Sequence, residues 1–156
     1  MVRPTQEMVK ENVKAAIEAL HQRDAYLLQK DVNERSISHK LASYLQVAFT
    51  DWNVDCEYNR NHDDPKLLKR LHIYAENVST DDVQAKTVFP DIIVHHRGTR
   101  DNLLVIEIKK TTNPQPDDFD LQKLREFKCQ LGYSYALFLR FRTGCEAIGV
   151  ERKKWI

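Results

Sequence analysis

The chain has 156 residues, which suits one domain with a substantial core rather than two domains. Its 24 Lys and Arg residues nearly balance its 23 Asp and Glu residues, and the net charge of +1 excludes a protein that is basic over its whole surface. No apolar run approaches the roughly 18 residues that a membrane-spanning helix needs, and the amino terminus does not read as a signal peptide. We therefore expect a single cytoplasmic domain over residues 1–156, with no membrane partner.

Three cysteines lie far apart in the chain, at Cys56, Cys129 and Cys145. Their odd number and the lack of a C-x-x-C pair indicate neither a disulfide framework nor a zinc cluster. We expect them to be reduced, small core residues.

Residues 4–30 are predicted to be helical because Met8, Val13, Ile17 and Leu20 recur near helical spacing. A break is expected between Gln22 and Asp24. This N-terminal helical extension, residues 1–32, is consistent with an additional layer on the domain or with a dimer contact.

A second helix is predicted over residues 33–49, with Asn33 or Ser36 as its N-cap and with apolar residues at helical period at Ile37, Leu41, Leu45 and Ala48. Glu34 precedes Ile37 by three positions and therefore falls on the same apolar face. A carboxylate there requires a partner. The helix dipole alone would also stabilise an acid in the first turn of the helix.

A short strand is predicted from Val54 to Asn59. Tyr58 and Arg60 lie near its end, within reach of a bound phosphate, although such residues more often pack or face solvent. The following segment, residues 61–87, is polar and is interpreted as an insertion.

Residues 89–94 and 103–109 are predicted to form an antiparallel hairpin around a polar loop. The second half is aliphatic except for Glu107, which shares one strand face with Lys109 because alternate residues point the same way. Pro90 cannot donate a ladder hydrogen bond, so Asp91 is expected at a strand start, an edge or a bulge. Folding of the hairpin would bring Asp91 close to Glu107. The structural alternative for Glu107 and Lys109 is an exposed salt bridge at a strand end, which would contribute little.

After the hairpin, a loop with two prolines leads to a helix capped by Asp117 or Asp118 and ended by Gly132. Its apolar positions are Leu121, Leu124 and Leu131. A strand over residues 133–141 and a final short strand over residues 146–150 are predicted next, followed by a basic tail.

Pro90-Asp91 followed by Glu107-Ile108-Lys109 resembles the signature of the PD-(D/E)XK nuclease superfamily. The predicted order of helix, three strands, helix and strand is similar to that family's core from residue 33 to residue 150. The resemblance implies an α/β protein with a restriction-endonuclease-like core, in which a central mixed β-sheet is flanked by helices.

The resemblance also implies a Mg²⁺ (or Mn²⁺) site formed by Asp91, Glu107, the main-chain carbonyl of Ile108 and Glu34. Such hard oxygen ligands suit Mg²⁺ at about 2.0 to 2.1 Å. The metal would polarise a phosphate oxygen and lower the pKa of a bound water, which Lys109 would position. Lys123, Tyr58 and Arg60 are candidate substrate contacts, Lys123 by family placement on the later helix.

The function implied is that of a metal-dependent nuclease, endonuclease-like, that hydrolyses phosphodiester bonds in nucleic acid. DNA is favoured over RNA, and cleavage of both strands of a duplex would favour a homodimer. The alternative is a catalytically inactive module of the same fold that binds nucleic acid or a protein within a larger assembly. A third hypothesis places an active site at His95-His96, but adjacent strand residues point to opposite faces and cannot easily share one ion.

Overall fold

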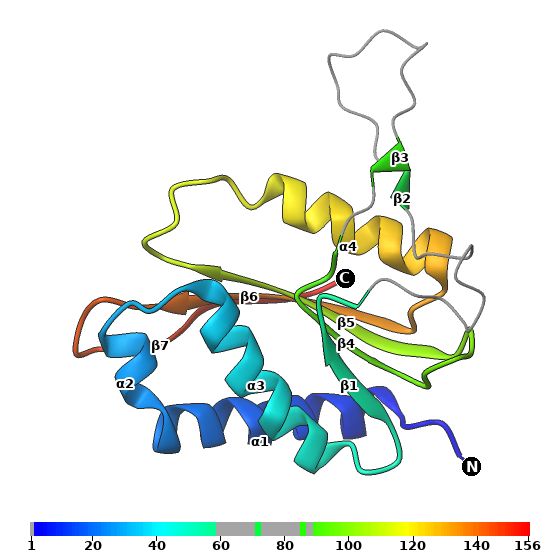
Figure 1. Cartoon of the computed structure of the whole chain (residues 1–156), viewed down its shortest axis with the longest axis horizontal. Coiled ribbons are helices and arrows are strands. Elements are labelled where there is room, and N and C mark those ends of the chain that lie inside the picture. The colour runs from blue at the N-terminus through cyan, green and yellow to red at the C-terminus, as the bar shows by residue number, and fades with distance from the viewer. Residues whose placement is uncertain (1, 59–70, 73–84, 87–88) are drawn as a thin grey trace, which may run out of the picture.

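The computed structural model of the chain describes residues 2–58, 71–72, 85–86 and 89–156. It is an α/β structure in which helices cover both faces of a five-stranded mixed sheet (Figure 1). The strands stand in the order β1 (Asn53–Cys56), β4 (Ile92–His95), β5 (Asn102–Lys110), β6 (Tyr135–Arg142) and β7 (Gly149–Trp155). β5 and β6 are parallel, and the other neighbouring pairs of this sheet are antiparallel. The predicted α/β class and the predicted hairpin are confirmed.

One face of the sheet is covered by α1 (Gln6–Arg23), α2 (Ala25–Gln29) and α3 (Glu34–Ala48) (Figure 1). The predicted break falls at Asp24, between α1 and α2. The apolar stripe of α1 is buried in the same core cluster as α3 and the sheet, through Val9, Val13, Ala16, Ile17 and Leu20. The N-terminal extension is therefore a layer of the domain.

The opposite face is covered by α4 (Asp118–Leu131), which provides the crossover that the parallel pair β5 and β6 requires. Gly132 adopts the left-handed conformation at φ 68° and ends α4 at the predicted position. A second core cluster lies under α4 and contains Phe127 and Phe138. The sheet is thus the middle layer of three, and β5 is buried between the two helical layers.

Four described residues of the segment predicted as a polar insertion form a second, two-stranded sheet. β2 (Leu71–His72) pairs antiparallel with β3 (Ala85–Lys86). Figure 1 shows this pair projecting beside α4.

Several predicted strands have different bounds in the structure, including β4, which begins at Ile92 and not at residue 89. β1 ends at Cys56 because Glu57 has a left-handed φ of 49°, which does not continue a strand. The prediction of a final strand over residues 146–150 is wrong, since β7 spans Gly149–Trp155 and includes most of the supposed basic tail. Its charged residues suit an edge strand, where they discourage pairing with other chains.

The prediction that the three cysteines are core residues is also wrong, because all three are free and exposed. Leucine, isoleucine, valine and aromatic side chains fill the core instead. Among the helices in the described ranges of the chain, none is both long and apolar enough to cross a membrane.

Candidate functional site

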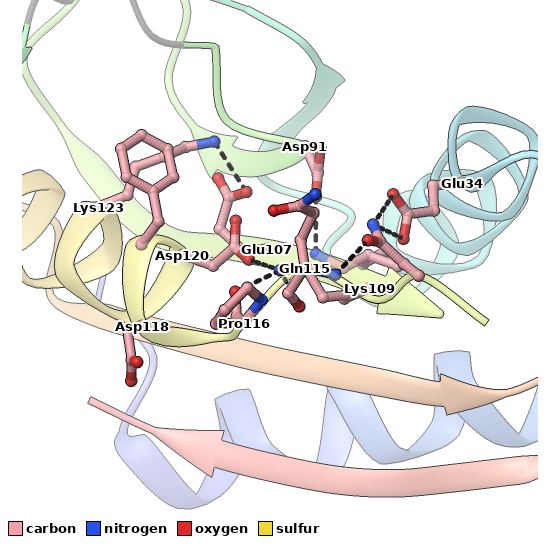
Figure 2. Close-up of a pocket in the computed structure, with 12 residues that line it drawn as sticks. Glu34, Asp91, Glu107, Lys109, Gln115, Pro116, Asp118, Asp120 and Lys123 are labelled. Carbon is pink, nitrogen blue, oxygen red and sulfur yellow. Dashed lines mark hydrogen bonds and ion pairs between the residues drawn. The ribbon is translucent and has the colours of Figure 1, made fainter. Parts of the chain in front are cut away.

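A cavity of about 570 Å³ opens where the end of β5 meets the first turns of α3 and α4 (Figure 2). Five carboxylates line it, from Glu34, Asp91, Glu107, Asp118 and Asp120. Two ammonium groups, from Lys109 and Lys123, also line it. The excess of acids makes the cavity electronegative, which favours a cation over a bare phosphate.

Two ion pairs join β5 to α4 at the floor of the cavity. Lys123 Nζ donates to Glu107 Oε2 at 2.9 Å, and Lys109 Nζ lies 2.5 Å from Asp120 Oδ2. Glu107 and Lys109 point towards α4 together because they are two positions apart on the strand. Their exposed fractions are 2% and 6%, so the alternative of an exposed strand-end salt bridge is wrong.

The ammonium group of Lys109 has two further acceptors, the carbonyl oxygens of Pro116 at 2.8 Å and Gln115 at 3.3 Å. With Asp120, these acceptors use all three of its N–H donors. Lys109 therefore fastens the loop between β5 and α4 to the wall of the cavity.

Where β5 extends past the first residue of β4, its backbone N–H groups donate hydrogen bonds to carboxylates. The ladder between the two strands stops at Ile92 opposite Ile106, and the preceding Pro90 has no N–H to extend it. The N–H of Ile108 donates instead to Asp91 Oδ2 at 2.7 Å. Because the N–H and C=O of a strand residue point to the same edge, the Ile108 carbonyl faces this edge too.

Glu34 makes the equivalent contact two residues further along β5. Its Oε2 accepts from the N–H of Lys110 at 2.8 Å, and the side-chain amide of Asn113 donates to both of its oxygens at 3.3 Å. Asn33 caps α3 through the N–H of Ser36 and so fixes Glu34 in the first turn. The partner that the sequence required for Glu34 is thus the strand backbone.

Burial raises the pKa of Glu107 well above its ordinary value, and the nearby charge of Asp91 raises it further against the opposing effect of Lys123. The pKa of Asp91 is also raised by burial, although the hydrogen bond from Ile108 and the charge of Lys123 act against this. Within the described residues, Glu107 Oε1 receives no hydrogen bond. A buried carboxylate oxygen without a donor is costly, so this atom calls for a proton or a cation.

The predicted metal ligands fit a divalent cation incompletely. Asp91, Glu107 and the Ile108 carbonyl offer hard oxygens on adjacent strands, and Mg²⁺ usually takes one or two carboxylates and completes its shell with water and phosphate. Within the ranges that the structure describes, however, no three His, Cys, Asp or Glu side chains gather as a metal cluster. Glu34 is engaged with Lys110 and Asn113 instead of completing such a cluster.

The predicted substrate contacts are placed differently from one another. Lys123 lines the cavity, but its exposed fraction is 7% and it is paired with Glu107. Tyr58 does not line this cavity; its ring lies 4.7 Å from that of His95. Arg60 is outside the described residues.

The two histidines of the third hypothesis have separate partners. His95 Nε2 lies 2.8 Å from Asp55 Oδ2, and His96 Nδ1 lies 2.8 Å from Asp101 Oδ2. The ring of His96 also stacks on Trp52. Neither histidine lines the acidic cavity.

Several residues of the site are not predicted from the sequence, namely Asp120, Asn113 and Phe119. Asp120 had a signal, because it precedes Lys123 by three positions and hence shares its face of α4. Asn113 lies in a loop, where no periodicity indicates direction. Asp118 is predicted as a cap and lines the cavity, but Figure 2 shows its carboxylate pointing away from the others.

Comparisons with known proteins return no match to a family model, to a curated protein or to a solved structure.

Proposed function

We propose that this protein is a metal-dependent nuclease that hydrolyses phosphodiester bonds in nucleic acid. The observation that carries the proposal is the buried pair Asp91 and Glu107 at an acidic cavity, with Glu107 Oε1 lacking a donor among the described residues. The strand order β1-β4-β5-β6, with α4 crossing between the parallel pair, supports a restriction-endonuclease-like core.

In this proposal the carboxylates of Asp91 and Glu107 and the carbonyl of Ile108 would hold Mg²⁺ or Mn²⁺. A cation bound there supplies Lewis-acid polarisation of a phosphate oxygen and lowers the pKa of water. The hydrogen bond from Ile108 N–H orients Asp91, and the ion pair with Lys123 orients Glu107. The protein thus holds both acids in place before substrate arrives, which is what electrostatic catalysis requires.

Lys109 is proposed to neutralise negative charge at the cavity wall and, by the family resemblance, to position the attacking water. In the structure its three donors are used by Asp120 and two loop carbonyls. Contact with a water therefore requires one of the carbonyls of Gln115 or Pro116 to be released. While Lys109 stays beside Glu107, its ammonium group keeps one positive charge inside the electronegative cavity.

A second candidate function is a non-catalytic module that binds nucleic acid or a protein partner. The observation in its favour is that both lysines of the cavity are already paired with acids, so the acids have a structural role without any metal. In that case Mg²⁺ would leave the melting temperature unchanged. The two candidates are therefore separated by metal binding.

The decisive experiment is calorimetric titration of Mg²⁺ and Mn²⁺ into the wild type, Glu107→Gln and the control Glu11→Gln, which changes an exposed acid of α1. We expect binding to the wild type and to the control, and none to Glu107→Gln. Equal binding to all three proteins would refute the assignment of the site.

A cleavage screen follows, with single- and double-stranded DNA and RNA, since all share the phosphodiester bond. Asp91→Ala, Glu107→Ala and Lys109→Ala are expected to lose cleavage while keeping the fold, monitored by circular dichroism. Full activity in all three variants would exclude a nuclease mechanism at this site.

A further inference from the structure

One of the two exposed phenylalanines lines the acidic cavity. The chain has six phenylalanines, and four of them are buried, namely Phe49, Phe127, Phe138 and Phe141. The exposed two are Phe119, at 51%, and Phe89, at 47%. Phe119 lines the cavity, and Phe89 precedes Asp91 by two positions. Phe119 is therefore the half-exposed phenylalanine of the cavity wall, and Phe89 is not among the residues that line the cavity.

The helix geometry explains why Phe119 is at the mouth of the cavity. It lies in the first turn of α4, four positions before Lys123, so the two side chains share one face of the helix. Lys123 is on the cavity floor and Phe127, another four positions on, is in the core. Phe127, Lys123 and Phe119 thus form a line along α4 from the core to the opening of the cavity. At the opening, the Phe119 ring has no core to pack into.

A half-exposed ring at this position offers a stacking surface to an occupant with a flat apolar face. About half of the Phe119 side chain stays in water, and covering this apolar surface with a ligand would be favourable. The cavity volume of about 570 Å³ is in the size range of small-ligand sites, which run from about 300 to 1,000 Å³. It is sized for a nucleotide unit, and a double helix is far larger.

The charges of the cavity point to the same class of ligand. Its two ammonium groups are paired with Glu107 and Asp120, so they offer little to the dense phosphate charge of a duplex. A nucleobase is neutral at neutral pH and has a π-face that can stack on an aromatic side chain. In a duplex that face is covered by neighbouring base pairs, and in an unpaired strand it is available.

We propose that the site takes single-stranded nucleic acid, with one unpaired base stacked on Phe119 and the adjoining phosphate placed over Asp91 and Glu107. This inference rests on the proposed function, because the phosphate position assumes the cation site. Phe119 acts here as a substrate-binding residue. The acids fix the position of the nucleic-acid backbone. Stacking on Phe119 requires an unpaired base, so Phe119 selects a single strand.

The test measures binding of three fluorescein-labelled probes by anisotropy. They are a short oligodeoxythymidylate, its duplex with oligodeoxyadenylate, and an abasic strand of the same length that keeps the phosphates and lacks the bases. Titrations are made in Ca²⁺, an oxygen-seeking cation with less strict geometry than Mg²⁺, and strand integrity is checked on a gel.

Five proteins are compared: the wild type, Phe119→Ala, Phe119→Trp, Asp91→Asn and the control Tyr26→Ala. Tyr26 is an aromatic residue on α2 with 65% exposure that does not line the cavity. We expect Phe119→Ala to weaken binding of the oligodeoxythymidylate by roughly 5- to 150-fold, the range measured for loss of one base stack. Its affinity for the abasic strand should stay at the wild-type value, and Tyr26→Ala should match the wild type with both probes.

Phe119→Trp keeps an aromatic face and adds a fluorescent reporter at the site. We expect it to bind the oligodeoxythymidylate like the wild type and to be quenched by that strand but not by the abasic one. The wild type should bind the single strand more tightly than the duplex.

The outcomes separate this inference from the proposed function. Ca²⁺-dependent binding of the abasic strand that Asp91→Asn abolishes, with no effect of Phe119→Ala on any probe, would overturn the stacking inference and leave the cation site standing. Duplex binding as tight as single-strand binding would overturn the preference for unpaired strands. Absence of binding to every probe would overturn both proposals.

Discussion

Lys123 on α4 donates a hydrogen bond of 2.9 Å to Glu107 on β5, and both side chains are buried. This pair is one of two ion pairs that link α4 to β5 at the cavity floor. Its acid also has Asp91 as a neighbour, and that second negative charge raises the pKa of Glu107 beyond the effect of burial. One ammonium group therefore compensates two carboxylates.

The variant Lys123→Met is expected to lower the free energy of unfolding by about 3 kcal/mol at pH 8, because it leaves a buried acid without its cation. A carboxyl whose folded pKa is raised binds its proton more tightly in the folded state. The loss should therefore shrink as the pH falls through the raised folded pKa of Glu107, because a bound proton then replaces the missing cation. Urea unfolding at several pH values measures this. The double variant Lys123→Met/Glu107→Gln should recover most of the stability, and Lys14→Met, at an exposed site, should lose little.

Asp91→Asn is expected to stabilise the protein in EDTA. The amide oxygen can still accept the hydrogen bond from Ile108, while the repulsion that the Asp91 charge exerts on Glu107 and the burial of that charge are removed. A gain of about 1 kcal/mol corresponds to a rise of about 2–4 °C in Tm for a chain of this size. Mg²⁺ should then raise Tm in the wild type and in the exposed control Asp51→Asn, but not in Asp91→Asn. A lower Tm for Asp91→Asn in EDTA would contradict this account.

Glu34→Ala is expected to cost about 1–3 kcal/mol, the penalty for leaving a backbone donor such as the N–H of Lys110 without its acceptor. Glu34→Gln keeps one acceptor oxygen and should cost less. Both variants should change Mg²⁺ affinity less than Asp91→Asn does, because Glu34 is engaged with Lys110 and Asn113. Thermal unfolding and calorimetry test the two effects separately, and loss of Mg²⁺ binding in Glu34→Gln would make Glu34 a metal ligand.

Asp31→Asn tests a cluster that ties the helical layer to the sheet. Asp31 Oδ1 accepts from Thr143 at 2.7 Å and Thr112 at 2.8 Å and lies 3.0 Å from Lys110 Nζ. These contacts lower the pKa of Asp31, with the hydrogen bond from Thr143 the largest cause. Stability from such a group is complete above the unfolded carboxyl pKa and is lost as the pH falls through the folded one. Asp31→Asn should therefore be less stable than the wild type at pH 7, and the difference should vanish in strong acid; chemical denaturation across this range is the measurement.

The hairpin and the α4 crossover are predictable because the spacing of apolar residues and the turn and capping residues indicate the same elements there. Glu107 is an acid inside an aliphatic run, and Gly132 follows the last helical apolar position, so local and tertiary signals coincide. The extent of β7 escapes prediction because an edge strand does not have to be apolar. In the sequence its charged Lys and Arg residues resemble a solvated tail. Only the hydrogen-bond ladder with β6 shows that they belong to a strand.

The site is only partly predictable for a physical reason. Strand parity places Glu107 and Lys109 on one face, but it cannot show that each pairs with α4. That pairing depends on how the helix packs across the sheet, which brings Asp120 and Lys123 into register with the strand. The position of Glu34 is indicated by helical period, whereas its partners on β5 and in the loop at Asn113 are set by tertiary packing.

Pro90 has an effect beyond its own position in the chain. A residue with an N–H there could prolong the pairing of β4 with β5, and the backbone groups of Ile108 would then be used up inside the sheet. The opening beside Ile108 is therefore produced by premature termination of one strand. The cavity is already present in the folded protein, so a ligand that bound there would not have to open a cleft.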